Sequence, residues 1–151
     1  MRGAIHQLKY RNLRAIAGTL AAFLGDYYRA GTIPADVLVP VPLHPKRLKE
    51  RGYNQSGLLA RELSRRVNLP LIDNCLVRTG LACSQAKTAN VKQRWDNVAD
   101  AFSCRYRVLT GKRVLLIDDV TTSGATLNAC AAAIKEAGAA SVWGLVLARE
   151  T

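Results

Sequence analysis

The sequence predicts an α/β fold, a mostly parallel sheet flanked by helices, and two observations support this. Apolar runs of strand length alternate along the chain with segments whose apolar residues recur at helical spacing. The last third also has the order strand, helix, strand, over Arg113–Asp118, Leu127–Ile134 and Ser141–Ala148. Parallel strands need a crossover connection of this kind, and a helix usually supplies it.

The first quarter of the chain predicts a helix and then a strand. Apolar residues from Leu13 to Tyr27 recur at helical spacing and are followed by Gly31, which predicts an amphipathic helix within residues 1–31. Asp36–Pro42 predicts a short buried strand. Its prolines prevent further ladder pairing, so the chain is expected to leave the sheet there.

The middle of the chain predicts a second helix, a strand and a long loop. Leu58–Val67 has helical spacing and follows the polar opening Tyr53–Ser56, and Leu69–Val77 has the apolar character of a strand. Residues 79–100 carry many small polar residues and little apolar periodicity. Loops of that length inside a compact domain are usually functional, so we expect a flexible functional loop there.

Composition indicates one domain with an anionic partner. The chain of 151 residues has the size of one domain, 1–151, and its formal charge is +11, from 22 basic and 11 acidic residues. Nucleic acid, a phosphorylated metabolite and a membrane surface all fit that charge, as does a basic surface with no such role. No apolar run is long enough for membrane insertion, and we expect a cytoplasmic protein. The cysteines have neither zinc-site nor disulfide-framework spacing: Cys75, Cys83, Cys104 and Cys130.

An apolar strand ends in two adjacent acids, Asp118 and Asp119, and the chain then turns through small hydroxylated residues into a helix. A helix N-terminus beyond a strand attracts anions, and Gly124 lets a phosphate approach the backbone. Ionised carboxylates accept hydrogen bonds from vicinal ribose hydroxyls but repel polyphosphates. The pattern therefore predicts a site for a ribose next to a monophosphate. The expected phosphate-binding residues are Thr121, Thr122, Ser123, Gly124, Ala125 and Thr126.

Other nucleotide motifs do not fit this segment. The Walker pattern G-x-x-x-x-G-K-[ST] and the Rossmann pattern G-x-G-x-x-G are both absent from the sequence. A purely structural alternative remains, in which the strand is core, the acids are solvated, and Thr121 or Thr122 caps a helix. Of the two tryptophans, Trp143 lies in an apolar strand and is expected in the core, whereas Trp95 either covers a ligand or anchors the loop.

The segment Val114–Thr126, a hydrophobic strand with two acids and a Thr/Ser-Gly-Thr-like loop, resembles the signature of the type I phosphoribosyltransferases. Beyond it, the similarity to the competence protein F (ComF) family covers nearly the whole chain. It is carried by Pro40–Gln55, Arg78-Thr79, Gln85, Arg94, Asn97 and Ala101-Phe102. Members of that family usually have a cysteine-rich segment first, and this sequence starts after it. It is either a naturally short member or a truncated chain.

The resemblance implies the type I phosphoribosyltransferase fold with a small irregular hood, and it assigns roles to residues. Asp118 and Asp119 would contact the ribose hydroxyls directly or through Mg²⁺, the implied cofactor, beside the phosphate-binding turn. Three basic residues after the first strand would neutralise the pyrophosphate, unless they are merely solvated: Lys46, Arg47 and Arg51. Three more lie in the segment that corresponds to a closing active-site loop, or in a loop without such a duty: Lys87, Lys92 and Arg94.

Two functions follow from the resemblance. The first is a Mg²⁺-dependent transferase that moves the phosphoribosyl group of phosphoribosyl pyrophosphate to an unidentified nitrogen nucleophile. The alternative is a non-catalytic module that senses phosphoribosyl pyrophosphate or a nucleotide and meets single-stranded DNA or DNA-processing proteins during DNA uptake and natural transformation. In that case a phosphate-tracking surface would include Arg61, Arg65, Arg66 and the stretch Arg105–Arg113. A homodimer is compatible with both.

Overall fold

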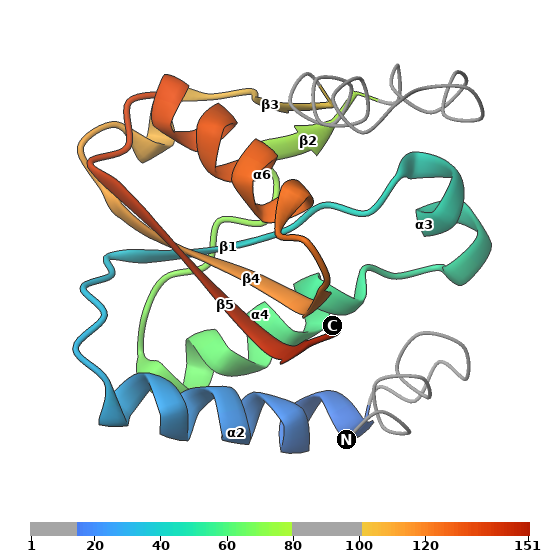
Figure 1. Ribbon diagram of the computed structural model, residues 1–151, viewed down its shortest axis with the longest axis vertical. Coiled ribbons are helices and arrows are strands. Elements are labelled where there is room, and N and C mark those ends of the chain that lie inside the picture. Colours follow the sequence, from blue (N-terminus) through green and yellow to red (C-terminus); the bar gives the residue numbers. More distant parts are fainter. Residues whose placement is uncertain (1–14, 80–100) are drawn as a thin grey trace.

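The computed structural model describes residues 15–79 and 101–151, which contain both helices and strands (Figure 1). The elements in chain order are α2 (Ala15–Ala30), β1 (Val37–Pro40), α3 (Pro45–Arg51), α4 (Gln55–Val67), β2 (Leu76–Arg78), β3 (Phe102–Cys104), the 3₁₀ helix η1 (Arg107–Leu109), β4 (Arg113–Thr121), α6 (Ala125–Glu136) and β5 (Ser141–Arg149). None of the helices in these two ranges is long and apolar enough to cross a membrane. The loop residues Lys87, Lys92, Arg94 and Trp95 lie outside the described residues.

The main sheet contains three strands in the order β1-β4-β5, and both pairs are parallel. Val37 of β1 lies opposite Val114 of β4, and Arg113 of β4 lies opposite Ser141 of β5. The predicted α/β class with a parallel sheet flanked by helices is therefore confirmed. Because the three strands run the same way, their carboxyl ends meet at one edge of the sheet. Ligands of open α/β sheets bind beyond this edge.

Helices cover both faces of the sheet, α6 on one and α2 with α4 on the other (Figure 1). The alternation of side chains along β4 explains this arrangement. Val114 and Leu116 pack with the buried residues of α6, whereas Leu115 and Ile117 pack with those of α2 and α4. Both sets are buried, which is why the strand reads as an unbroken apolar run.

The strand expected at Leu69–Val77 is only partly correct. Leu71 makes a single parallel bridge to Leu38, whose amide donates to the Pro70 carbonyl and whose carbonyl accepts from the Ile72 amide. Pro70 has no N–H to offer the sheet, so the ladder does not extend along this segment. The regular strand here is β2, which pairs antiparallel with β3 in a separate two-stranded sheet.

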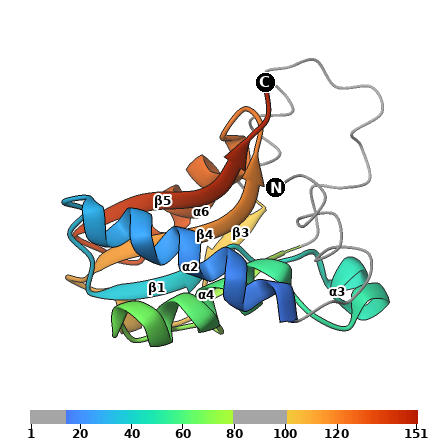
Figure 2. The same cartoon turned by 90° about the horizontal axis from the view of Figure 1, so that it is seen from below.

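The connection from β1 to α4 contains α3, a helix that the apolar pattern did not predict. Pro45 occupies its first turn, and the His44 side chain accepts a hydrogen bond from the Lys46 amide at the N-cap. Gly52 ends the helix in the left-handed conformation, with φ of 79°. None of the α3 residues is buried, so the segment has no apolar stripe to reveal it. Figure 2 shows α3 extending away from the sheet.

The expectation that Trp143 belongs to the core is wrong. Trp143 lies on β5, the edge strand of the described sheet, and 49% of its surface is exposed. Along the same strand only Leu145 is buried, packing with α2 and α4. An apolar strand at a sheet edge has only one neighbour to cover it, so apolar sequence alone overstated the burial.

Candidate functional site

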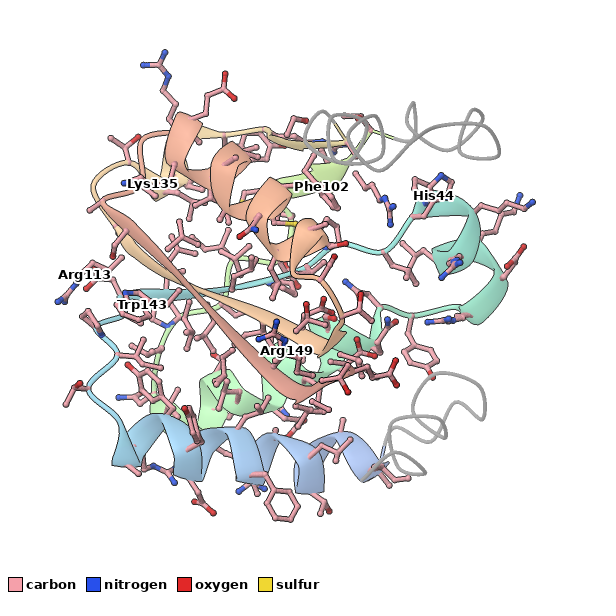
Figure 3. The ribbon with its side chains drawn as sticks, viewed as in Figure 1. His44, Phe102, Arg113, Lys135, Trp143 and Arg149 are labelled. Carbon is pink, nitrogen blue, oxygen red and sulfur yellow. The ribbon has the colours of Figure 1, made fainter. Side chains whose placement is uncertain are left out.

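The candidate site lies at the carboxyl edge of the sheet, where the segments following β1 and β4 meet. Val41, just after β1, donates its amide to the Ile117 carbonyl of β4 at 2.9 Å. The Asn54 side-chain amide donates to the Val41 carbonyl at 3.0 Å, which brings the start of α4 to the same place. Figure 3 shows Arg149 at this end of β5, while Arg113 and Trp143 lie toward the opposite end of the sheet.

Asp118 and Asp119 are the central residues of this edge, and both are nearly buried. Their exposed fractions are 9% and 3%. Oδ1 of Asp118 accepts a hydrogen bond from the Ser56 hydroxyl at 2.8 Å and another from the Asp119 amide at 2.9 Å. Oδ1 of Asp119 accepts from the Val120 amide at 2.7 Å. The protein thus holds one oxygen of each carboxylate, so the acids are not the freely solvated groups of the structural alternative.

Burial, followed by the neighbouring charge of Asp119, raises the pKa of Asp118 from its ordinary value to about 6. The hydrogen bond from Ser56 acts against both and lowers the pKa. Near neutral pH the Asp118 carboxylate is therefore mostly charged, although burial has removed much of the water that would stabilise its charge. A cation or a hydroxyl donor placed beside it would stabilise the charged form, which is a property of binding sites.

The turn between β4 and α6 has the geometry of an anion site. Gly124 is the N-cap of α6 with φ of 82°, a left-handed conformation that favours glycine. A Cβ at Gly124 would meet nothing within 4 Å, so the space next to this backbone is open. The Ser123 hydroxyl accepts from the Ala125 amide at 3.3 Å, and Thr122 and Ser123 are exposed. The amides at the start of α6 and these hydroxyls can donate to a phosphate.

The same turn tests the alternative that Thr121 or Thr122 serves only to cap a helix. Thr121 is the last residue of β4, and its carbonyl accepts from the Glu150 amide. The N-cap of α6 is Gly124, so neither Thr121 nor Thr122 caps the helix. Capping therefore does not account for the threonines of this turn.

The three cations expected near the pyrophosphate are all on α3. Lys46 and Arg47 are exposed, and Arg51 donates to the Gln55 side chain at 3.1 Å. The segment follows β1 at the same edge as the acid pair, but as a helix and not as a simple turn. Their role in pyrophosphate binding stays a prediction.

Two residues at this edge were missed by sequence reasoning. Among the described residues outside β4, only Ser56 donates a side-chain hydrogen bond to Asp118. The polar run that opens α4 was the feature of the sequence that could have indicated it. Arg149 ends β5 directly opposite Thr121 and is exposed, and its signal was a charge at the end of an apolar strand. Arg149 adds a positive charge beside the turn that precedes α6.

The donor set allows a magnesium ion that arrives with its ligand. Carboxylate oxygens are the donors that Mg²⁺ prefers, and the consecutive acids Asp118 and Asp119 are near enough for their charges to interact. Among residues 15–79 and 101–151, no three His, Cys, Asp or Glu side chains gather into a metal cluster. Mg²⁺ commonly keeps several waters and uses one or two carboxylates plus substrate phosphates, so the acid pair fits this kind of binding.

The fold agrees with comparisons to known proteins. Residues 48–150 match the Phosphoribosyl transferase domain, and the chain belongs to that family. The glutamine phosphoribosylpyrophosphate amidotransferase from Bacillus subtilis, solved with ADP and GMP, has a TM-score of 0.59 at 21% identity over 87% of this chain and 26% of that one. Adenine phosphoribosyltransferase from Leishmania donovani has a TM-score of 0.55 at 17% identity, over 87% and 52% of the two chains. These likenesses show the type I phosphoribosyltransferase fold.

Within this class the chain is a homologue of competence protein F. Competence protein F of Haemophilus influenzae is 34% identical over 95% of this chain and 66% of that protein. DNA utilization protein YhgH of Escherichia coli K12 is 33% identical, over 91% and 62%. Competence protein ComFC of Bacillus subtilis is 36% identical, over 75% and 44%. The chain thus spans two thirds or less of the length of these curated relatives.

Proposed function

We propose that this chain binds phosphoribosyl pyrophosphate or a ribonucleotide at the carboxyl edge of its sheet. One observation carries the proposal: β4 runs without interruption through the buried acid pair into an exposed turn at the N-terminus of α6. A sugar with hydroxyls at one end and a phosphate at the other matches this order of groups. The fold family, whose solved members include phosphoribosyltransferases, supports the same ligand class.

In this proposal each group of site residues binds a different part of the ligand. Asp118 and Asp119 accept hydrogen bonds from the ribose hydroxyls or hold Mg²⁺. The residues from Thr121 to Thr126 bind the 5′-phosphate through backbone amides and hydroxyls. Lys46, Arg47 and Arg51 neutralise the diphosphate from α3.

We further propose that the chain transfers the phosphoribosyl group to a nitrogen nucleophile. The bond between ribose C1 and the pyrophosphate oxygen breaks, a bond from nitrogen to C1 forms, and the nucleophile releases a proton. Mg²⁺, when bound, neutralises the charge of the departing pyrophosphate. The protein's own residues orient the ribose and neutralise charge, and no covalent nucleophile is needed.

Calorimetry tests binding directly. Wild type and the double variant Asp118→Asn, Asp119→Asn are titrated with phosphoribosyl pyrophosphate, with and without Mg²⁺. We expect the double variant to lose about tenfold or more in affinity, because two charge-assisted contacts disappear. Asp26→Asn is the matched control, since Asp26 is an exposed acid of α2. Equal affinity of the double variant and the wild type contradicts the proposed site.

Turnover needs its own assay. Pyrophosphate release from phosphoribosyl pyrophosphate is followed across a panel of purine and pyrimidine bases and primary amines. We expect release with at least one nucleophile, and loss of that release in the double variant. Tight binding without release from any nucleophile would reject the transferase and leave the binding function standing.

A second function is favoured by the names of the relatives, competence and DNA utilization proteins, and by the +11 charge. Here the basic surface binds single-stranded DNA. Three arginines of the expected surface form ion pairs: Arg61 with Asp73, Arg65 with Glu62, and Arg113 with Asp36. The exposed Arg105 and Arg107 are the better candidates for phosphate contacts.

The salt dependence of DNA binding tests this second function. Affinity for single-stranded DNA is measured by fluorescence anisotropy as the salt concentration rises. We expect it to fall steeply with salt, to weaken in Arg105→Ala, Arg107→Ala, and to be unchanged by Asp118→Asn, because phosphate contacts release counterions. Binding that is insensitive to salt would rule out this surface.

A further inference from the structure

Ser56 joins two parts of the molecule that are far apart in sequence. It is the second residue of α4, 62 positions before Asp118, and only 1% of its surface is exposed. Its hydroxyl donates to Oδ1 of Asp118 at 2.8 Å. A hydrogen bond to a charged group is stronger than one between neutral groups, and burial protects this one from competing water.

The start of α4 holds this hydroxyl in place through several contacts. Asn54 caps the helix, accepting from the Ser56 amide at 3.1 Å, and its side-chain amide donates to the Val41 carbonyl beyond β1. Arg51 donates to Gln55, which is also buried. These contacts connect the start of α4 to the end of β1 and to α3, and so hold Ser56 in position next to Asp118.

The hydrogen bonds at Asp118 leave its two oxygens in different situations. Oδ1 accepts from both Ser56 and the Asp119 amide, so two protein donors already occupy it. A carboxylate has about four acceptor positions on its two oxygens. Because two protein donors engage Oδ1, the rotation of the carboxylate is restricted, and we expect a ligand hydroxyl to approach Oδ2.

We propose that Ser56 is a positioning residue that fixes the Asp118 carboxylate for recognition of the ribose hydroxyls, without contacting the ligand itself. The inference rests on the proposed ribose-phosphate function. Without the Ser56 hydroxyl only the Asp119 amide holds Oδ1, so the carboxylate rotates more easily and its contact with the sugar weakens. The turn at the start of α6 is untouched, so phosphate recognition is retained.

The test compares three probes by calorimetry. Ribose 5-phosphate has both ring hydroxyls, tetrahydrofurfuryl phosphate has the same ring and phosphate without them, and inorganic phosphate has neither ring nor hydroxyls. In the wild type we expect ribose 5-phosphate to bind about tenfold more tightly than tetrahydrofurfuryl phosphate. Ser56→Ala should reduce this preference to about twofold, while the affinity for inorganic phosphate stays within about twofold of wild type.

Matched variants separate positioning from a structural role. Ser56→Thr keeps the hydroxyl and should restore the preference for ribose 5-phosphate. Ser64→Ala removes another α4 hydroxyl, which donates to the Leu69 carbonyl, and should leave the preference unchanged. If Ser56→Ala does not fold, Ser56→Cys carries the same test, because it keeps the volume with a weaker donor.

Each outcome is decisive. A Ser56→Ala protein that keeps the preference overturns the inference, and so does one that loses the same factor for all three probes. In both cases wild-type binding leaves the proposed function intact. A wild type that binds phosphoribosyl pyrophosphate but does not prefer ribose 5-phosphate to tetrahydrofurfuryl phosphate overturns the inference alone. A wild type that binds neither phosphoribosyl pyrophosphate nor any of the three probes overturns the proposed function, and the inference with it.

Discussion

The carboxyl group of Asp118 makes the stability of the protein depend on pH. Its pKa is raised to about 6 in the folded chain, from an ordinary value of 3.8, chiefly by burial. Because the folded state prefers the protonated form of Asp118, the stabilisation of the fold by the neutral carboxyl group is complete below about pH 4. It is lost as the pH rises through about 6. At neutral pH the ionised Asp118 thus destabilises the fold.

We predict that Asp118→Asn is more stable than wild type at neutral pH. The gain should be on the order of 2 to 3 kcal/mol at about pH 7.5 and should vanish at about pH 4, where both side chains are neutral. Urea unfolding at the two pH values measures it. Asp26→Asn, on the exposed face of α2, should show no such pH-dependent gain. A gain of equal size at both pH values would contradict the prediction.

The backbone of Gly124 gives a second prediction, because its φ of 82° favours glycine while the space around it is open. We expect Gly124→Ala to destabilise the fold by about 1 kcal/mol through backbone strain alone. Gly18 of α2 is the matched control, since a Cβ there also meets nothing within 4 Å but its conformation is helical. Gly18→Ala should stabilise by about 0.5–1 kcal/mol. Thermal unfolding compares the pair, and equal effects would show that the φ of Gly124 is not the cause.

At this scale the sequence predicted the acid pair and the glycine turn but missed Ser56. The acids and Gly124 lie within a few residues of one another, so a local pattern reveals them. Ser56 reaches Asp118 across 62 positions, and only the packing of α4 against the sheet brings them together. A residue that acts through a tertiary contact forms no local pattern with its partner, so the sequence alone does not reveal its role.

Among the elements, the start of β4 is fastened to the residue before β1 by one acidic side chain. Asp36 accepts from the Arg113 amide at 2.8 Å and from its guanidinium nitrogens at 3.1 and 2.8 Å. These hydrogen bonds lower the pKa of Asp36 to about 2. The stabilisation is therefore present above about pH 4 and is lost as the pH falls through about 2.

We predict that Asp36→Asn lowers the thermal unfolding temperature at neutral pH. The difference from wild type should narrow steadily as the pH falls from about 5 toward 2, because wild-type Asp36 then becomes protonated as well. This dependence is opposite in sign to that of Asp118. Asp73→Asn, whose partner Arg61 is 3.7 Å away in an exposed pair, is the control and should have a smaller effect. A difference that does not change with pH would contradict the role of the charge.

Helices and strands with one apolar stripe or a continuous apolar run were predictable, as α2, α4, β4, α6 and β5 show. Those without such a pattern were not. The helix α3 has no buried residue, and β2 and β3 have three residues each, too few to show a period. The prediction that a strand begins at Leu69 was wrong because Pro70 has no N–H to donate to a ladder.

For the whole molecule, the formal charge of +11 on 151 residues implies self-repulsion in the folded state. We predict that raising sodium chloride from about 20 to about 300 mM increases the unfolding temperature, because salt screens repulsion between exposed charges. Differential scanning fluorimetry measures the trend. A fall in the unfolding temperature would mean that exposed ion pairs, such as Arg65 with Glu62, outweigh the repulsion.

The contrast in exposure between the turn and the acids has a kinetic consequence. Thr122 and Ser123 are exposed, whereas Asp118 and Asp119 have only 9% and 3% of their surface exposed. In the proposed binding mode a ligand that approaches the edge meets the turn first, so we expect its phosphate to dock before its sugar. Variants of the turn should therefore slow association, and variants of the acids should shorten the residence time of the bound ligand.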